Sequence, residues 1–89
     1  MKAVVTVLGK DRTGIIAAVS NLLYQKGVNI LDISQTILSG MFTMIMLVDT
    51  GYANKTLDEI AEALHQKELE MGLSIRIQRE DIFQAMHRI

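Results

Sequence analysis

The segment "AVVTVLGKDRTGIIAAV" (residues 3–19) passes from one kind of residue periodicity to another. Its first six residues are short of polar side chains and rich in β-branched ones, which favours a β-strand. The apolar residues that follow recur at the spacing of one helix face: Ile15, Ile16, Val19, Leu22 and Leu23. The segment therefore predicts a strand that leads through a glycine-flanked loop into an amphipathic helix.

Gly27 follows this first helix, at the position where a left-handed residue commonly ends one. Residues 28–38 then alternate as a strand does, with one side carrying Leu31, Ile33, Gln35 and Ile37. Val28 and Ile30 are out of phase with that side, which indicates a β-bulge near Leu31. Residues 39–40 ("SG") predict a hairpin turn into a further strand over 41–49.

The second half of the chain predicts another helix and another strand. Thr56, followed three residues later by Glu59, is a capping box that marks a helix start, and Gly72 marks its end. Residues 73–79 ("LSIRIQR") alternate cleanly as the last strand. In the tail, residues 81–89 place their apolar side chains on one stripe, which predicts a short terminal helix.

This order predicts an α+β fold of the ferredoxin-like βαββαβ type, with a short C-terminal helix. Four antiparallel strands form the sheet of such a fold, and both main helices cover one face. The strands at 3–8 and 41–49 are central in that topology, and those at 28–38 and 73–79 are edges. The residues agree, because both central strands are apolar at nearly every position.

Length and composition restrict the class of protein. With 89 residues the chain is expected to be one domain, residues 1–89, with the helical tail at about 81–89. A net charge of -1 gives no reason to expect direct binding to nucleic acid or to an anionic membrane. The chain has no cysteine and no segment resembling a signal peptide or a membrane span. A cytoplasmic protein without a cofactor or a metal is therefore predicted.

One face of the predicted sheet has no helix to cover it. Alternation along the central strands assigns to that face Val4, Thr6, Leu8, Met41, Thr43, Ile45 and Leu47. Leaving about four large apolar side chains in water would forgo roughly 6 to 12 kcal/mol. Either the terminal helix or a second copy of the chain is expected to cover them. A nine-residue tail covers only part of such a face, which favours a homodimer, formed face to face or by pairing edge strands.

The topology, together with "GKDRTGI" (residues 9–15) and "GVNI" (residues 27–30), resembles the ACT domain family. The similarity covers residues 2 to about 80 and is closest to small stand-alone ACT proteins and to the ACT portions of the glycine-cleavage repressor and of formyltetrahydrofolate deformylase. The resemblance implies a regulatory domain that associates in pairs. It also implies that an amino acid binds between the loop after the first strand and the start of the second.

The resemblance assigns ligand-binding roles to two short segments. The candidate residues are Asp11, Arg12, Thr13, Gly14, Ile15, Asn29 and Ile30. Asp11 and Gly14 stand where the family has Asp-x-x-Gly, and Asn29 with Ile30 where it often has Asn-Ile. Thr13 replaces a proline that many members carry, so ligand preferences of those relatives need not apply.

The loop is chemically suited to a zwitterion. Backbone N–H groups in the first turn of a helix receive a carboxylate, and Asp11 beside them suits an ammonium group. Asn29 offers a donor and an acceptor. The alternative is that Asp11 or Thr13 only caps the helix, and both roles are compatible. Arg12 is a candidate contact, or simply a solvated cation.

Catalytic signals are weak in this sequence. His65 lies among polar neighbours and His87 lies in the tail, and no metal-ligand spacing occurs. Phe42 is the only aromatic residue on the central strands, which disfavours an RNA-binding surface. An acylphosphatase-like reaction using Arg12 and Asn29 has only fold analogy in its favour. We therefore predict a non-enzymatic regulatory module that binds a small amino acid or a related metabolite and signals through its homodimer to a protein partner. The alternative is a protein–protein interaction or oligomerisation module without a small-molecule ligand.

Overall fold

A computed structural model describes residues 1–86 of the chain. In chain order the elements are β1 (Lys2–Lys10), α1 (Ile15–Gln25), β2 (Asn29–Leu38), β3 (Met41–Asp49), α2 (Leu57–Met71), β4 (Ser74–Arg79) and α3 (Glu80–Met86). This order confirms the predicted βαββαβ arrangement with an additional C-terminal helix. The end of the predicted tail, with His87 and Ile89, lies outside the described residues.

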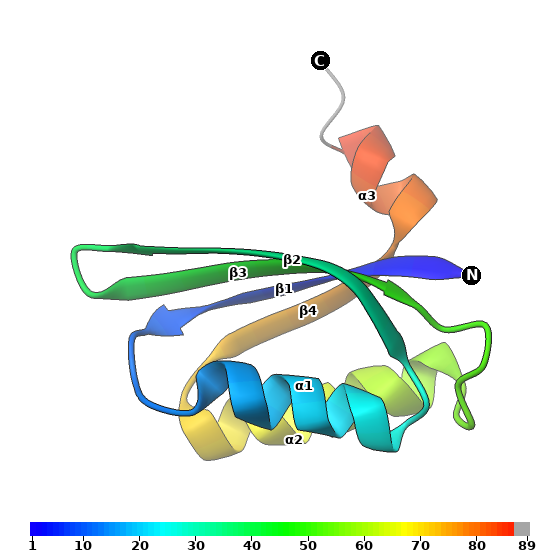
Figure 1. The fold of residues 1–89 in the computed structure, drawn as a ribbon, viewed down its shortest axis with the longest axis horizontal. Coiled ribbons are helices and arrows are strands. Elements are labelled where there is room, and N and C mark those ends of the chain that lie inside the picture. Colours follow the sequence, from blue (N-terminus) through cyan, green and yellow to red (C-terminus); the bar gives the residue numbers. More distant parts are fainter. Residues whose placement is uncertain (87–89) are drawn as a thin grey trace.

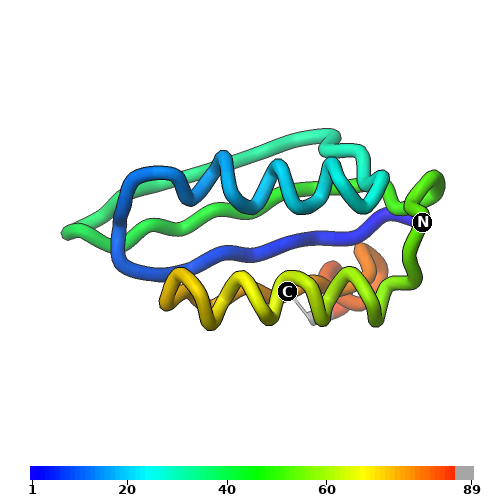
Figure 2. The backbone as a smooth tube through the Cα atoms, turned by 90° about the horizontal axis from the view of Figure 1, so that it is seen from below, coloured from blue at the N-terminus to red at the C-terminus, as the bar shows by residue number. Residues whose placement is uncertain are grey.

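The four strands form one antiparallel sheet in the order β2-β3-β1-β4. As predicted, β1 and β3 are central and β2 and β4 are edges. Helices α1 and α2 run alongside each other on one face of the sheet, and α3 lies on the other face (Figures 1 and 2). The strand β1 ends at the loop that leads into α1, so this loop lies at the same end of the sheet as the β2–β3 hairpin.

The hydrophobic core lies between the sheet and the two main helices. On the sheet it contains Ala3, Val5 and Val7 of β1 and Phe42, Met44, Met46 and Val48 of β3. The helices contribute Ile15, Val19 and Leu23 from α1 and Ile60 and Leu64 from α2. Two of the three methionines of β3, Met44 and Met46, are buried and fill core space.

The predicted boundaries of α2 are confirmed. Thr56 accepts a hydrogen bond from the N–H of Glu59, and the Glu59 carboxylate accepts one from the N–H of Thr56. The hydrogen bonds that the Glu59 carboxylate accepts from the backbone N–H and the hydroxyl of Thr56 lower the pKa of Glu59. At the other end Gly72 is left-handed, with φ 66°. Gly27, after α1, is also left-handed, as predicted.

The start of α1 differs from the expectation that Asp11 or Thr13 caps it. The N-cap residue is Gly14, which has φ 87° and no side chain with which to accept a hydrogen bond. The left-handed conformation lets the chain turn sharply into the helix, so the helix begins too late for either side chain to cap it. The capping interpretation of Asp11 and Thr13 is therefore wrong, and the Asp11 carboxylate has no role in the cap.

The strand β2 is bulged and largely open to solvent. The pairing between β2 and β3 shifts register between Ile30 and Asp32, which confirms the predicted bulge near Leu31. Every residue from 31 to 38 is exposed. After the bulge, Ile33, Gln35 and Ile37 lie opposite Met46, Met44 and Phe42, on the side of the sheet that α1 and α2 cover. The end of β2 therefore extends beyond α1 and leaves apolar side chains uncovered.

The face away from α1 and α2 carries the side chains that the alternation assigns to it. Helix α3 packs against one end of this face, on β1 and β4, where Val4 is only 5% exposed. At the other end Leu8, Met41 and Ile45 are 41 to 43% exposed. The terminal helix thus covers part of its own sheet and leaves an apolar area bare. Within residues 1–86, no helix is both long and apolar enough to cross a membrane.

Candidate functional site

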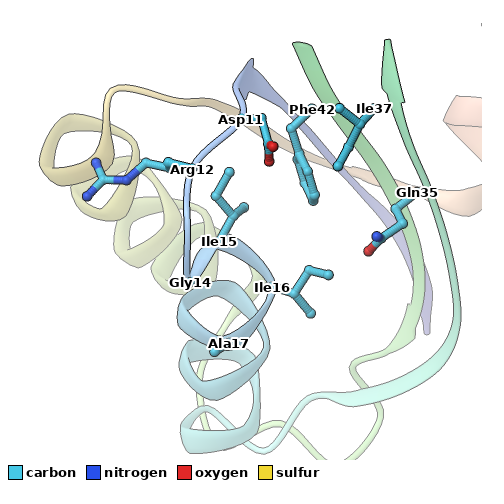
Figure 3. A pocket seen from close by; sticks show the side chains of 9 residues that line it. All are labelled: Asp11, Arg12, Gly14, Ile15, Ile16, Ala17, Gln35, Ile37 and Phe42. Atoms are coloured by element: carbon cyan, nitrogen blue, oxygen red, sulfur yellow. The ribbon is translucent and has the colours of Figure 1, made fainter. Parts of the chain in front are cut away.

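A pocket of about 470 Å³ lies between the start of α1 and the ends of β2 and β3. The loop after β1 and the first turn of α1 form one wall, and the sheet forms the other (Figure 3). Its lining residues are Asp11, Arg12, Gly14, Ile15, Ile16, Ala17, Gln35, Ile37 and Phe42. The size lies within the usual range of pockets for small molecules.

Asp11 is the acidic side chain among the lining residues. Its carboxylate points toward the space between α1 and β3 (Figure 3). The backbone N–H of Asp11 donates a 2.8 Å hydrogen bond to the carbonyl of Gly40, which ties the loop to the β2–β3 hairpin. The loop backbone therefore holds the carboxylate at the pocket without using it as a helix cap.

Arg12 is one of the residues that line the pocket, but its side chain extends away from the other lining side chains (Figure 3). Its guanidinium turns away toward the end of α2, where Nη1 donates a 3.3 Å hydrogen bond to the carbonyl of Met71 (Figure 3). This carbonyl belongs to the last turn of α2, which contains no basic residue of its own. Arg12 thus stabilises the negative end of α2, and its charge lies outside the pocket.

The remaining loop residues have distinct positions. Thr13 is exposed and does not line the pocket. Gly14 lines it, and a Cβ added there would meet no atom within 4 Å. The left-handed φ, rather than lack of space, therefore explains the glycine. Ile15 is buried in the core and closes the pocket from below.

Asn29 and Ile30 lie far from this loop in the same chain. In the sheet, Asn29 pairs with Asp49, and Asp49 pairs with Lys2 at the start of β1. The loop, in contrast, follows the end of β1. Eight strand residues separate these ends by roughly 25 Å. Asn29 also shares the sheet face of Asp49, away from α1 and α2. The expectation that Asn29 lies close to the loop is therefore wrong within one chain, because α1 carries the chain back to the opposite end of the sheet.

Five of the lining residues were not predicted from the sequence: Ile16, Ala17, Gln35, Ile37 and Phe42. Gln35 could have been recognised as a candidate site residue, because it is a polar residue in a row of β2 side chains that is otherwise apolar. Recognising that row as part of the pocket requires knowing that β2 ends where α1 begins. That relation follows from the topology and not from either segment alone.

Within one chain, an acylphosphatase-like use of Arg12 with Asn29 is contradicted, since the two residues lie at opposite ends of the sheet and the Arg12 guanidinium is bonded to the carbonyl of Met71. In the part of the chain that the structure describes, no three His, Asp or Glu side chains gather in a way that would hold a metal ion. His65 is exposed on α2 and contacts Glu68, with 3.0 Å between Nδ1 and Oε2.

Comparison with known proteins identifies the family. Residues 2–78 match the model of the ACT domain. A UPF0237 protein of Listeria innocua is 49% identical over 89 residues, the full length of both chains. ACT domains are typically ligand-binding regulatory modules and commonly dimerise.

Solved structures agree with this match. An ACT domain protein from Streptococcus pneumoniae is 37% identical, with a TM-score of 0.82 over 94% of both chains. The formyltetrahydrofolate deformylase of Pseudomonas syringae is 28% identical, with a TM-score of 0.80 over 88% of this chain and 27% of that one. A candidate repressor of the glycine cleavage system is 25% identical, with a TM-score of 0.74 over 86% of this chain and 44% of that one. This chain belongs to the ACT domain family.

Proposed function

We propose that this chain is a non-catalytic regulatory module that binds a small amino acid, or a related metabolite, in the pocket between α1 and the end of β2. The bound state passes through a homodimer to a protein partner. One observation carries the proposal: the Asp11 carboxylate, the open first turn of α1 and the end of β2 converge on one pocket of suitable size.

The pocket offers both poles that a zwitterion needs. Asp11 suits an ammonium group. The first turn of α1 has no side-chain cap at Gly14 and no acidic residue, so its N–H groups remain open to a carboxylate. Gln35 adds a donor and an acceptor from the opposite wall. Gln35 thus takes the polar role that the sequence assigned to Asn29.

The strand β2 supports a particular form of the dimer. Its edge carries several exposed apolar side chains, namely Leu31, Ile33, Ile37 and Leu38. The opposite edge, β4, is shorter, and the carboxylate of Glu68 already accepts a hydrogen bond from the N–H of Ile75 there. Long apolar edges tend to pair with another chain. We therefore propose that two copies pair antiparallel along β2.

This pairing would bring the second part of the predicted site to the pocket. With a two-fold axis at residue 34 and the bulged Leu31 left out of the pairing, residue 30 of one copy lies opposite residue 37 of the other. Ile30 lies opposite Val48, on the helix-covered side of the sheet, so Ile30 of the second copy would face the pocket mouth. A ligand at this seam can shift the assembly if it binds one arrangement more tightly than another.

Thermal unfolding with each free amino acid tests the binding proposal. A ligand at 100 times its Kd adds about 2.7 kcal/mol to the free energy of unfolding. Asp11→Asn is expected to remove the shift, and Asp58→Asn, which also removes one exposed carboxylate but lies on α2, is expected to keep it. An unchanged shift in Asp11→Asn, or no shift with any amino acid, would contradict the proposal.

Light scattering at micromolar concentration tests the dimer. Leu31→Lys places a charge on the β2 edge and is expected to give the mass of a monomer. Ile45→Lys places the same charge on the bare sheet face and is expected to leave the dimer intact. A monomeric unmodified chain would contradict the dimer itself, and dissociation by Ile45→Lys alone would contradict pairing along β2.

The alternative function is a protein–protein interaction module without a ligand. The bare end of the sheet face supports it, because Leu8, Met41 and Ile45 remain exposed beside α3 and exposed apolar patches commonly mark contacts. The absence of any amino-acid effect, together with loss of partner binding in Ile45→Lys, would favour this alternative.

A further inference from the structure

The walls of the pocket are apolar beyond what a small polar amino acid would require. Ile15 and Phe42 are buried at its base, while Ile16 of α1 and Ile37 of β2 form its two sides. Figure 3 shows Ile16, Ile37 and Phe42 facing the same space. The polar groups, Asp11 and Gln35, come from opposite walls at separate points of the lining.

The charges of the pocket are unbalanced. Asp11 faces the pocket, but Arg12, the basic residue among those that line it, donates to the carbonyl of Met71 and its guanidinium points away. A positive group on a ligand therefore meets a side chain of opposite charge. A negative group meets only backbone N–H groups, beside the Asp11 carboxylate. This asymmetry favours an amine over a ligand whose charge is wholly negative.

We infer that the pocket selects α-amino acids with a hydrophobic side chain, such as leucine, isoleucine, valine or phenylalanine, over glycine and serine and over 2-oxo acids. The inference rests on the proposed function and deepens it. The ammonium group lies against Asp11, the carboxylate lies at the first turn of α1, and the ligand side chain lies between Ile16, Ile37 and Phe42.

The volume and the lining support this selection. A glycine or serine in a pocket of about 470 Å³ would leave the isoleucine side chains in contact with water. An apolar side chain removes that surface from water. Each buried methylene contributes about 0.8 kcal/mol. Because about 1.4 kcal/mol corresponds to a tenfold change in affinity, one methylene increases affinity about fourfold. Leucine is thus expected to bind tens of times more tightly than serine.

Isothermal titration of the full chain with leucine, phenylalanine, serine, glycine and 4-methyl-2-oxopentanoate tests the inference. The expected order places leucine or phenylalanine first, with serine, glycine and the 2-oxo acid at least tenfold weaker. Asp11→Asn is expected to weaken leucine binding at least tenfold. It is also expected to reduce the ratio of the affinity for leucine to the affinity for the 2-oxo acid. Equal or tighter binding of the 2-oxo acid by the unmodified chain would overturn the ammonium assignment.

A matched pair of variants on β2 tests the apolar contact. Ile37 lines the pocket, while Ile33 lies on the same strand and face, is also exposed and does not line it. Ile37→Ala is expected to weaken leucine at least fivefold more than serine, whereas Ile33→Ala is expected to change the affinities for leucine and serine by the same factor. Because both side chains are exposed, both variants are expected to fold, and light scattering on each separates any change in dimerisation.

The outcomes distinguish this inference from the proposed function. Tighter binding of serine or glycine than of leucine, lost in Asp11→Asn, would overturn hydrophobic selection and leave amino-acid binding standing. An equal loss of leucine affinity in Ile37→Ala and Ile33→Ala would overturn the contact with Ile37. No binding of any compound would overturn both.

Discussion

The carboxylate of Glu68 on α2 accepts a 2.6 Å hydrogen bond from the backbone N–H of Ile75 on β4. This bond satisfies a backbone donor of an edge strand with a side chain from a helix. It is the main cause of a lowered pKa at Glu68, and the nearby His65 ring lowers it further. The contact ties α2 to β4 and leaves β2 as the more open edge.

Glu68→Gln is expected to reduce the free energy of unfolding by about 1 kcal/mol at pH 7, since a charge-assisted hydrogen bond becomes a neutral one. The folded-state pKa of Glu68 lies below the ordinary value of 4.5. Its contribution is therefore complete above pH 4.5 and is lost as the pH falls through the folded-state pKa. Urea unfolding from pH 7 to pH 3 measures the free energy of unfolding of Glu68→Gln and of the unmodified chain. The difference between these two free energies is expected to decrease toward acid pH.

Glu70→Gln provides the control for this measurement. Glu70 is exposed on the same helix and pairs with Lys67 at 2.9 Å, a surface ion pair of little energetic value. The free energy of unfolding of Glu70→Gln is expected to equal that of the unmodified chain across the pH range. A constant difference between Glu68→Gln and the unmodified chain at every pH would contradict the assigned role of the Glu68 charge.

Arg12→Ala is expected to lower stability without lowering ligand affinity. The variant loses the hydrogen bond to the Met71 carbonyl and the favourable charge at the end of α2, together worth about 0.5 to 1 kcal/mol. Thermal unfolding measures the stability, and titration with leucine measures the affinity. Lys10→Ala, which removes a neighbouring cation, serves as the control. A tenfold loss of affinity in Arg12→Ala alone would place its charge in the binding site.

Gly27→Ala is expected to destabilise the chain more than Gly40→Ala. Both glycines are left-handed, with φ 76° and 79°, so both variants incur a backbone cost of about 1 to 2 kcal/mol. At Gly27 the added Cβ would also lie 2.9 Å from the carbonyl oxygen of Tyr52, whereas at Gly40 it meets nothing within 4 Å. Chemical denaturation is expected to show at least about 1 kcal/mol between them. Equal losses would contradict the close packing at Gly27.

Thr56→Ala is expected to lower the free energy of unfolding by about 1 kcal/mol, because α2 loses its N-cap. Thr56→Ser keeps the hydroxyl and is expected to retain most of that stability. Thermal unfolding of the two variants provides the measurement. A loss in Thr56→Ser as large as that in Thr56→Ala would assign the effect to the methyl group instead of the cap.

Several elements of the fold were predictable because their signals are local. The capping box at Thr56, the left-handed glycines and the β2 bulge each depend on residues close together in the chain. The alternation of apolar residues also distinguished central strands from edges. The capping of α1 was the exception, because Gly14 and not Asp11 ends the loop.

The candidate site was only half predictable. The motif around Asp11 indicated where one wall would lie, but not which side chains would face it. Arg12 turns toward Met71, which is 59 residues away in the sequence. Gln35 and Phe42 reach the pocket because β2 and β3 meet at the hairpin beside the loop. None of these directions is encoded by the spacing within a single segment.

The sequence by itself determined the order of strands and helices, the turns between them and the loop that carries Asp11, because propensity, capping and periodicity act over a few residues. Only the tertiary structure decided that Asn29 lies at the far end of the sheet and that Ile37 and Gln35 face Asp11. The physical reason is that α1 reverses the chain direction. The start of β2 is therefore carried away from the loop, and its end is brought back beside it.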